Sequence, residues 1–353
     1  MKKTLAVLLS AALLTLSASA VSAAPDTSAK AMIVVHAESG AVLAEKNADT
    51  PMLIASTTKL MTALTALELA VPEREITVLP EWTAVEGSSM YLRAGERYTL
   101  RELLEGLLLA SGNDAALAIA GSLGGGAFID RMNRKAEELG LTAAHFSNPH
   151  GLDDAEHYAS AHDLAVIMTA ALQNDVLAEI LSMRSAVIHG ISYVNHNKLL
   201  WGCPGVTGGK TGYTKAAGRC LVTSCERGGL RLICVTLSDA NDWKDHASLY
   251  DWAYASFASF TLPAGTVAEQ VPAVGTESGK CEAVLGESAA LCLPKDAAVT
   301  LRAALPHFVF FPVNGAAAGR LDILSDGVLA GTVPLIWKIS GSPRQDCIGI
   351  YPI

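Results

Sequence analysis

The stretch ASTTKLMTA at residues 55–63 opens a run in which apolar residues recur at helical spacing. Ser56 therefore stands at or near the start of a predicted helix, with Lys59 one turn later on the same face. A serine hydroxyl becomes a good nucleophile only when a base takes its proton, and a buried lysine near a second cation can be neutral enough to serve. Free N–H groups at a helix start also favour a developing oxyanion. Taken alone, the pattern is better explained as an ordinary helix cap.

Two more short patterns follow. SGN at residues 111–113 falls in a loop between two predicted helices, where a hydroxyl and a carboxamide can face a cleft. KTG at residues 210–212 immediately precedes a predicted strand at 216–224, and a lysine and a threonine on a strand edge can bind a carboxylate. Gly212 leaves space for an extended peptide to pair with that edge. Taken separately, SGN is best explained as a turn, and KTG as an edge strand whose lysine protects it from pairing with other chains.

Together and in this order, the three patterns form the S-x-x-K, S-x-N and K-T-G set of penicillin-recognising serine enzymes. Residues 55–63 resemble the nucleophile segment of serine D-alanyl-D-alanine carboxypeptidases, the low-molecular-mass penicillin-binding proteins. Other blocks similar to that family are FSNPHGL (146–152), HYASAHDLA (157–165), GGKTGYT (208–214) and AGRCL (217–221). The resemblance covers about residues 30–260, and the remainder matches the family's usual C-terminal domain more loosely.

The resemblance implies catalytic roles for five residues. Ser56 would attack the carbonyl between the last two D-alanines of a peptidoglycan stem peptide. Lys59 would accept its proton, kept partly neutral by the charge of Lys210. Ser111 would relay a proton to the leaving D-alanine, and Asn113 would hydrogen-bond the substrate and the base.

The resemblance also implies a substrate-binding strand. The backbone N–H groups of Ser56 and Tyr213 would form the oxyanion hole, and Thr211 would hold the terminal carboxylate beside Lys210 and Gly212. Water would then hydrolyse the acyl-enzyme, with no metal and no cofactor. β-Lactam antibiotics would act as covalent inhibitors.

One position departs from the family pattern. Many relatives carry an arginine ahead of the closing helix that helps hold the substrate carboxylate. Counting back from Trp252, the corresponding residue here is Asp242, with Lys244 nearby. Either Lys244 substitutes for the arginine, or Thr211 and Lys210 suffice.

Three histidines near the second block invite a metal-site hypothesis. His150, His157 and His162 have spacings that fit no ligand motif. The family resemblance places them in structural loops around the cleft, so we expect no metal site.

The order of predicted elements indicates an α+β fold. Strands at 31–36 and 41–45 precede a block of helices, and strands at 218–224 and 230–237 precede a closing helix at 249–260. This order predicts a β-lactamase/transpeptidase-like domain, a sheet with an inserted helical region. One helix is predicted to begin at residue 56. The others are predicted to span 99–110, 113–120, 127–139, 160–172 and 175–181.

A boundary follows at residues 263–265. Beyond it, short β-like runs separated by turn residues predict a small all-β domain. The runs lie at 267–274, 281–285, 298–304, 308–312, 317–325 and 327–336. We therefore expect a signal peptide at 1–23, a catalytic domain at 24–262 and a β-rich domain at 263–353.

The N-terminus is typical of a secretory leader. Lys2 and Lys3 precede an apolar run at 5–16 and small residues before position 23. An uncleaved anchor is the alternative, but the run is short for a ~30 Å hydrocarbon core. No amphipathic membrane helix is visible at the end of the sequence. We predict an extracytoplasmic protein, secreted or cell-wall associated, with no clear membrane anchor.

The amino-acid composition excludes further classes of protein. The 353 residues carry a formal net charge of −9, which argues against a nucleic-acid partner, and half of them are hydrophobic, which excludes a disordered chain. Seven cysteines are an odd number, so at least one is unpaired or pairs between chains. Cys281 and Cys292 flank residues 286–287 symmetrically, and a hairpin there would bring them within disulfide reach. Their alternative role is that of small buried hydrophobes.

Three other functions compete with the carboxypeptidase. A class A-like β-lactamase would need a carboxylate base between the second and third patterns, and Glu137 and Glu138 superficially offer one. A D,D-endopeptidase would act on cross-links with the same groups. A non-catalytic β-lactam sensor would not need an activated nucleophile, so the combined presence of Ser56, Lys59 and Lys210 speaks against it.

Overall fold

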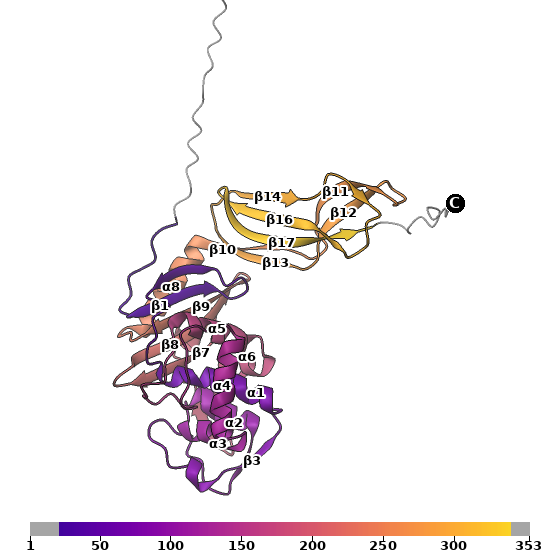
Figure 1. Cartoon of the computed structure of the whole chain (residues 1–353). Helices are drawn as coiled ribbons and strands as arrows, with labels where there is room; N and C mark the ends of the chain where they lie inside the picture. Colours follow the sequence, from indigo (N-terminus) through magenta and orange to yellow (C-terminus); the bar gives the residue numbers. More distant parts are fainter. Residues whose placement is uncertain (1–20, 340–353) are drawn as a thin grey trace, which may run out of the picture. The chain divides into compact units, whose positions relative to one another are not determined.

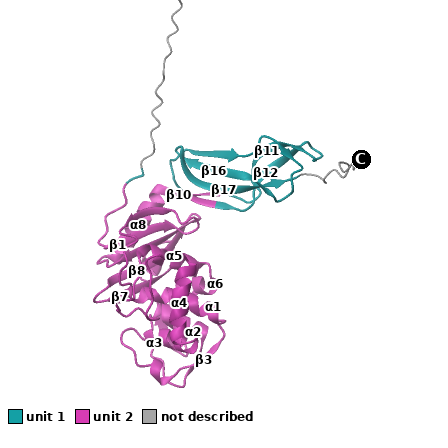
Figure 2. Cartoon of the chain, in the orientation of Figure 1, with its two compact units in different colours: residues 1–22, 262–289, 293–353 teal, residues 23–261, 290–292 magenta. Residues whose placement is uncertain are grey.

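The computed structural model describes residues 21–339 (Figure 1). Most of the predicted leader, the C-terminal end at 340–353 and Cys347 lie outside these residues. The described chain divides into two units (Figure 2). The first, which we call the catalytic unit, comprises residues 23–261 and 290–292, and the second, the β unit, comprises 262–289 and the residues from 293 onward.

A five-stranded antiparallel sheet, ordered β2-β1-β9-β8-β7, forms the frame of the catalytic unit. Its strands are β1 (Ala31–His36), β2 (Val42–Lys46), β7 (Val206–Thr214), β8 (Gly218–Arg227) and β9 (Leu230–Leu237). The β8–β9 hairpin turns at residues 228–229, as predicted. β7, which carries the KTG pattern, lies at the sheet edge with one side free to pair with an extended ligand.

The helices of the inserted region lie between β2 and β7 in the sequence. They are η1 (Ala55–Thr58), α1 (Lys59–Leu69), η2 (Pro80–Trp82), α2 (Leu100–Leu109), α3 (Asn113–Ser122), α4 (Gly126–Glu138), α5 (Ala161–Leu172), α6 (Asp175–Ser182) and α7 (Leu199–Gly202). α8 (Asp242–Ser256) follows β9. Thr99 and Glu102 form a capping box at the start of α2, which fixes that boundary as the sequence predicts.

Two hydrophobic cores lie on opposite faces of the sheet. β1 is buried along its whole length. Its successive side chains point to opposite faces of the sheet, so each face must be covered by a core. Ile33 and Val35 join the core formed with the inserted helices. Met32 and Val34 join a second core with Tyr250 of α8. The sheet is therefore covered on both faces, and the predicted α+β arrangement with an inserted helical region is confirmed.

The β unit is built on a six-stranded sheet ordered β14-β16-β17-β12-β11-β15. Its strands are β11 (Val267–Val274), β12 (Lys280–Leu285), β14 (Val299–Ala304), β15 (Val309–Phe310), β16 (Ala317–Ser325) and β17 (Val328–Lys338). Residues 263–339 contain no helix, so the prediction of an all-β module is confirmed for the part that the structure describes.

Several elements differ from the prediction. The closing helix starts at Asp242 and ends at Ser256, and residues 257–262 form β10 (Phe257–Leu262), paired with β13 (Ala289–Pro294). The aromatic spacing at 257–260 fits helix and strand alike, so the distant partner β13 decides. The short hairpins β3 (Glu75–Thr77) with β4 (Arg97–Thr99), and β5 (Ser185–Ile188) with β6 (Ile191–Val194), are also new, because strands of three or four residues show little periodicity.

The candidate disulfide between Cys281 and Cys292 does not form. Both thiols are free and buried. Cys281 belongs to β12, which pairs with β11 and β17, whereas Cys292 belongs to β13, which pairs with β10. The two strands never form the expected hairpin, so the alternative role as buried hydrophobes holds.

No single helix within residues 21–339 is both long and apolar enough to cross a membrane. α5 and α6 reach the required length and composition only as a pair, and they bend by 106° at their junction.

Candidate active site

Ser56 lies in the short helix η1, directly ahead of α1. The residue before it, Ala55, has φ of 47°, a left-handed conformation that is strained for a residue with a Cβ. Gly151 packs so closely that a Cβ on it would stand 1.9 Å from the carbonyl oxygen of Ala55. Ser56 therefore sits on a strained turn held in place by close backbone packing.

Lys59 connects the nucleophile to two other segments. Its Nζ lies 2.7 Å from Ser56 Oγ, 2.7 Å from Asn113 Oδ1 and 2.8 Å from the carbonyl oxygen of His150. The side chain is fully buried. Three fixed partners aim the amine at the hydroxyl, which is the geometry that a general base requires.

The charge of Lys59 is disfavoured in this position. Burial lowers its pKa well below the usual value, and the nearby charge of Lys210 lowers it further, while Asp114 raises it. A lysine with a depressed pKa spends more time as the neutral amine, which can take the proton of Ser56.

Lys210 and Ser111 form a second pair. Lys210 Nζ donates to Ser111 Oγ at 3.0 Å and to the carbonyl oxygen of Thr211 at 2.8 Å. Burial lowers the pKa of Lys210 to about 7. Ser111 has φ of 59°, so the turn before α3 is also left-handed at the residue that faces the site.

β7 passes unusually close to the nucleophile. A Cβ on Gly212 would stand 3.0 Å from Ser56 N and 3.0 Å from the carbonyl oxygen of Ile54. Glycine is required for that approach. It brings the backbone at Gly212 close to Ser56 N, the N–H that the family resemblance pairs with Tyr213 N–H in an oxyanion hole.

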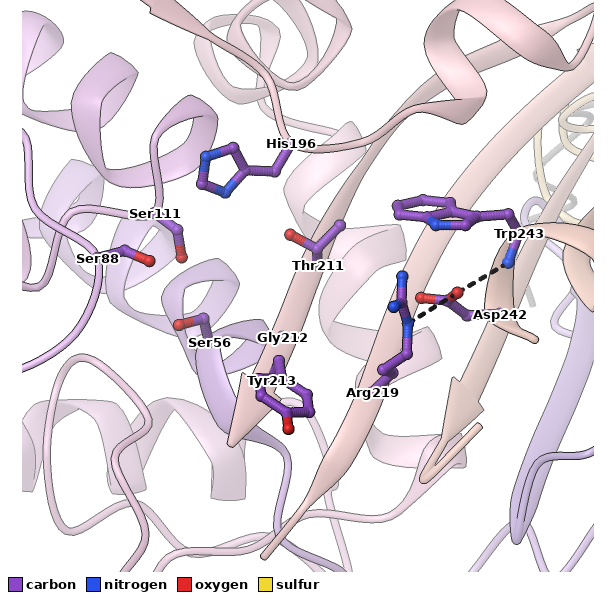
Figure 3. Close-up of a pocket in the computed structure, with 10 residues that line it drawn as sticks. All are labelled: Ser56, Ser88, Ser111, His196, Thr211, Gly212, Tyr213, Arg219, Asp242 and Trp243. Atoms are coloured by element: carbon purple, nitrogen blue, oxygen red, sulfur yellow. Dashed lines mark hydrogen bonds and ion pairs between the residues drawn. The ribbon is translucent and has the colours of Figure 1, made fainter. Parts of the chain in front are cut away.

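These groups open into one pocket (Figure 3). Its lining residues come from η1, the loop before α2, the turn before α3, the segment before α7, the edge strand β7, its neighbour β8 and the start of α8. They are Ser56, Ser88, Ser111, His196, Thr211, Gly212, Tyr213, Arg219, Asp242 and Trp243. The structure thus gathers the predicted residues of all three patterns, with Lys59, Asn113 and Lys210 buried just beneath the surface.

Asp114 is a supporting residue that the sequence analysis missed. It is fully buried and accepts hydrogen bonds from Ser89 Oγ at 2.6 Å, Met90 N at 2.9 Å and Leu92 N at 3.0 Å. Asn113 Nδ2 donates to the carbonyl oxygen of Glu86 at 2.6 Å. Together these bonds hold the loop that presents Ser88 to the pocket. The only sign of this role in the sequence was the position of Asp114 directly after the SGN pattern.

His157 supports the nucleophile turn from beneath. Its Nδ1 accepts from Ser147 N at 3.1 Å, so Nε2 carries the proton and donates to Thr58 Oγ1 at 2.7 Å. Thr58 Oγ1 in turn donates to the carbonyl oxygen of Ala55 at 2.8 Å. Burial lowers the pKa of His157 to about 4, which keeps the ring neutral in this relay.

The other two histidines have separate environments. His150 gives its carbonyl oxygen to Lys59, while its Nδ1 accepts from Leu152 N at 3.2 Å. Burial lowers the pKa of His150 to about 4, and the charge of Lys59 adds to the effect. His162 is exposed and contacts Asp49 at 3.0 Å.

The carboxylates required by the β-lactamase alternative are outside the pocket. Glu138, at the end of α4, forms an ion pair with Arg131 at 2.6 Å, and Glu137 is exposed. Asp242 is the acidic residue among those that line the pocket, and its Oδ1 accepts from Arg219 Nε at 3.1 Å. Lys244 is exposed and is not among the lining residues.

With this geometry established, comparison with known proteins identifies the family. A sequence model described as D-alanyl-D-alanine carboxypeptidase matches residues 18–241. The chain belongs to the D-alanyl-D-alanine carboxypeptidase family. It is 38% identical over 244 residues to the D-alanyl-D-alanine carboxypeptidase DacB2 of Mycobacterium tuberculosis, a match that covers 65% of this chain and 84% of the relative. It is 32% identical over 338 residues to DacC of Escherichia coli, which covers 89% of this chain and 84% of that one.

Solved structures of a penicillin-binding protein and of a DD-transpeptidase share the fold. Penicillin-binding protein 5 of Haemophilus influenzae is 26% identical, with a TM-score of 0.81 over 90% of this chain and 98% of the relative. A Streptomyces DD-transpeptidase is 29% identical, with a TM-score of 0.63 over 65% of this chain and 99% of the relative. The protein is therefore a serine-type D-alanyl-D-alanine carboxypeptidase with the fold of penicillin-binding proteins.

Proposed function

We propose that this carboxypeptidase removes the terminal D-alanine from peptidoglycan stem pentapeptides through an acyl-enzyme on Ser56. The observation that carries the proposal is the contact of 2.7 Å between Ser56 Oγ and Nζ of the fully buried Lys59. Burying an amine costs stability, and a protein that only binds its ligand gains nothing from an amine beside a serine hydroxyl.

Acylation follows from these contacts. Neutral Lys59 accepts the proton of Ser56 as the oxygen attacks the carbonyl between the last two D-alanines. The oxyanion that forms lies between the backbone N–H groups of Ser56 and Tyr213, which stabilise its charge. Asn113 fixes Lys59 through Oδ1.

The leaving group and the water need proton transfers of their own. Ser111, hydrogen-bonded to Lys210, gives its hydroxyl proton to the nitrogen of the departing D-alanine and receives in exchange the proton that Lys59 took from Ser56, so Lys59 is neutral again. Water then attacks the ester, Lys59 takes a proton from the water, and this proton passes to Ser56 Oγ as the ester bond breaks. The products are D-alanine and the stem peptide shortened by one residue.

The same nucleophile supports two further parts of the proposal. β-Lactams acylate Ser56, because their strained amide enters the site in place of the scissile bond. We expect slow hydrolysis of that adduct, because Glu137 and Glu138 do not line the pocket and so do not supply the additional carboxylate base that a class A β-lactamase uses. The protein works outside the cytoplasm, as its signal-peptide pattern indicates.

The deciding experiment incubates the protein with diacyl-L-Lys-D-Ala-D-Ala and measures released D-alanine, with Ser56→Ala as the inactive control. Stoichiometric release by the wild type and none by the variant is the expected result. Absence of D-alanine release by the wild type would point instead to a non-catalytic sensor or to an endopeptidase that cleaves cross-links. Rapid turnover of a chromogenic cephalosporin, instead of one-to-one labelling of Ser56, would favour the β-lactamase.

A further inference from the structure

The pocket extends past the reacting groups. In Figure 3, Thr211 lies between Ser56 and Ser111 on one side and Arg219 and Asp242 on the other. The acyl transfer proposed above uses only the first side. The second side holds the pocket's only permanently charged cation, the guanidinium of Arg219, counted over the ten lining residues.

The register of β7 and β8 places this cation next to Thr211. Tyr213 is the direct cross-strand partner of Arg219, and Thr211 is the partner of Leu221. Directly opposed residues share a face, and so do residues two apart on one strand. Thr211 and Arg219 are therefore diagonal neighbours on the same face, roughly 7–8 Å apart at the backbone. A carboxylate held between a hydroxyl and a guanidinium fits that separation.

The guanidinium is oriented for a ligand. Its Nε donates to Asp242 Oδ1 at 3.1 Å, and its Cζ lies 5.9 Å from the centre of the Trp243 ring. The described residues give its terminal nitrogens no partner, and the side chain is 45% exposed. An arginine held at Nε presents the remaining N–H groups as a fork that matches a carboxylate.

We propose that Arg219 binds the terminal carboxylate of the substrate together with Thr211, an inference that rests on the proposed function. Asp242 occupies the position where an arginine was expected, and its side chain is 5% exposed and lines the same pocket. Without Arg219 that negative charge would repel an incoming carboxylate. The cation therefore comes from β8, with Asp242 as its positioning residue and Lys244 taking no part.

The test compares diacyl-L-Lys-D-Ala-D-Ala with its C-terminal amide. The wild type should prefer the acid. Arg219→Leu should lower kcat/KM for the acid by about 10- to 100-fold, the range of hydrogen bonds to a charged group, and leave kcat/KM for the amide unchanged. The retained amide rate also reports that the variant is folded. Equal losses for acid and amide would overturn the proposal.

Two variants serve as controls. Arg231→Leu removes a similarly exposed arginine of the same sheet, paired with Glu226 and outside the pocket, and should keep the acid preference. Arg219→Leu with Asp242→Asn removes both charges and should still lack the preference. If this double variant regains the wild-type preference, Arg219 only neutralises Asp242 and the proposal is wrong.

A second arm separates this inference from the proposed function. Acylation by benzylpenicillin should be faster than acylation by its methyl ester in the wild type, and Arg219→Leu should remove the difference. Absence of D-alanine release with this difference intact would overturn the proposed function alone. Acid and ester reacting alike in the wild type would overturn the role of Arg219 alone.

Discussion

Lys210 illustrates at the residue scale how function can cost stability. Its ammonium is buried and donates to a hydroxyl and a carbonyl rather than to a carboxylate, and burial lowers its pKa to about 7. In the unfolded chain the pKa returns to the usual value for lysine. Between these two values the unfolded state binds more protons than the folded state, so this residue makes stability rise with pH.

Lys210→Met should therefore raise the free energy of unfolding near pH 7 while abolishing activity. The gain should shrink by up to about 1.4 kcal/mol per pH unit from pH 7.5 to 9.5, because the wild type recovers stability there. Urea unfolding at several pH values measures it. Lys338→Met, at an exposed lysine, is the matched control and should give no such trend. A gain independent of pH would contradict the linkage.

Gly212 is the second residue whose local geometry makes a prediction. A Cβ there would force β7 away from Ser56 N by a few tenths of an ångström. Removing a whole oxyanion donor costs about 10²–10³ in kcat, so a displaced one should cost at least about 10-fold in the rate of penicillin acylation.

Gly212→Ala should show this loss with a Tm close to that of the wild type. Stopped-flow acylation and thermal melting measure the two quantities. Gly126→Ala is the control, because a Cβ on Gly126 meets nothing within 4 Å. A normal acylation rate in Gly212→Ala would show that β7 can shift without disturbing the oxyanion hole.

At the scale of elements, the segment 86–92 depends on one buried side chain at the start of α3. Both oxygens of Asp114 accept backbone N–H groups, from Met90 and from Leu92. An asparagine in either orientation would set its NH2 group against one of these donors. Asp114→Asn should therefore cost about 1–3 kcal/mol in the free energy of unfolding.

The same substitution has an electrostatic consequence. Asp114 raises the pKa of Lys59, so its loss should move the acid limb of the acylation profile to lower pH. Urea unfolding and a pH series of acylation rates test the two effects. Asp130→Asn, at an exposed position on α4, should change neither. An unchanged acid limb would show that the two groups are electrostatically independent.

At the scale of the whole molecule, the boundary between the units is not a simple cut. Residues 290–292 of β13 belong to the catalytic unit, and Cys292 packs in the core that contains Tyr250. A solved relative from Mycobacterium tuberculosis is covered over 95% of its length by 67% of this chain, so folded relatives close to the size of the catalytic unit exist.

A chain ending at residue 262 should therefore keep its kcat/KM on a small soluble peptide. It should lose about 1–2 kcal/mol of stability, because β10 loses its partner and Cys292 leaves the core. Cys292→Ala in the full chain isolates the core contribution. Steady-state kinetics and urea unfolding give both numbers. Loss of activity in a folded truncated chain would show that the β unit contributes to catalysis.

Much of the fold was predictable because its signals are local. The capping box at Thr99 and Glu102, the buried run of β1 and the glycine turn between β8 and β9 each depend on neighbours within a few residues. Ser56 and Lys59 are likewise one turn apart. The order of the three short patterns then indicated which chemistry to expect.

The tertiary structure decided what depends on distant partners. It brought Lys210 to Ser111, paired β10 with β13 instead of extending α8, and separated Cys281 from Cys292. It also placed Arg219 beside Asp242. Burial, pKa shifts and strand pairing arise from groups far apart in the chain, whereas periodicity and capping arise from groups close together. Local signals in the sequence were therefore enough for most elements and for the reactive side chains, whereas the tertiary fold set how these side chains meet and which cation lines the pocket.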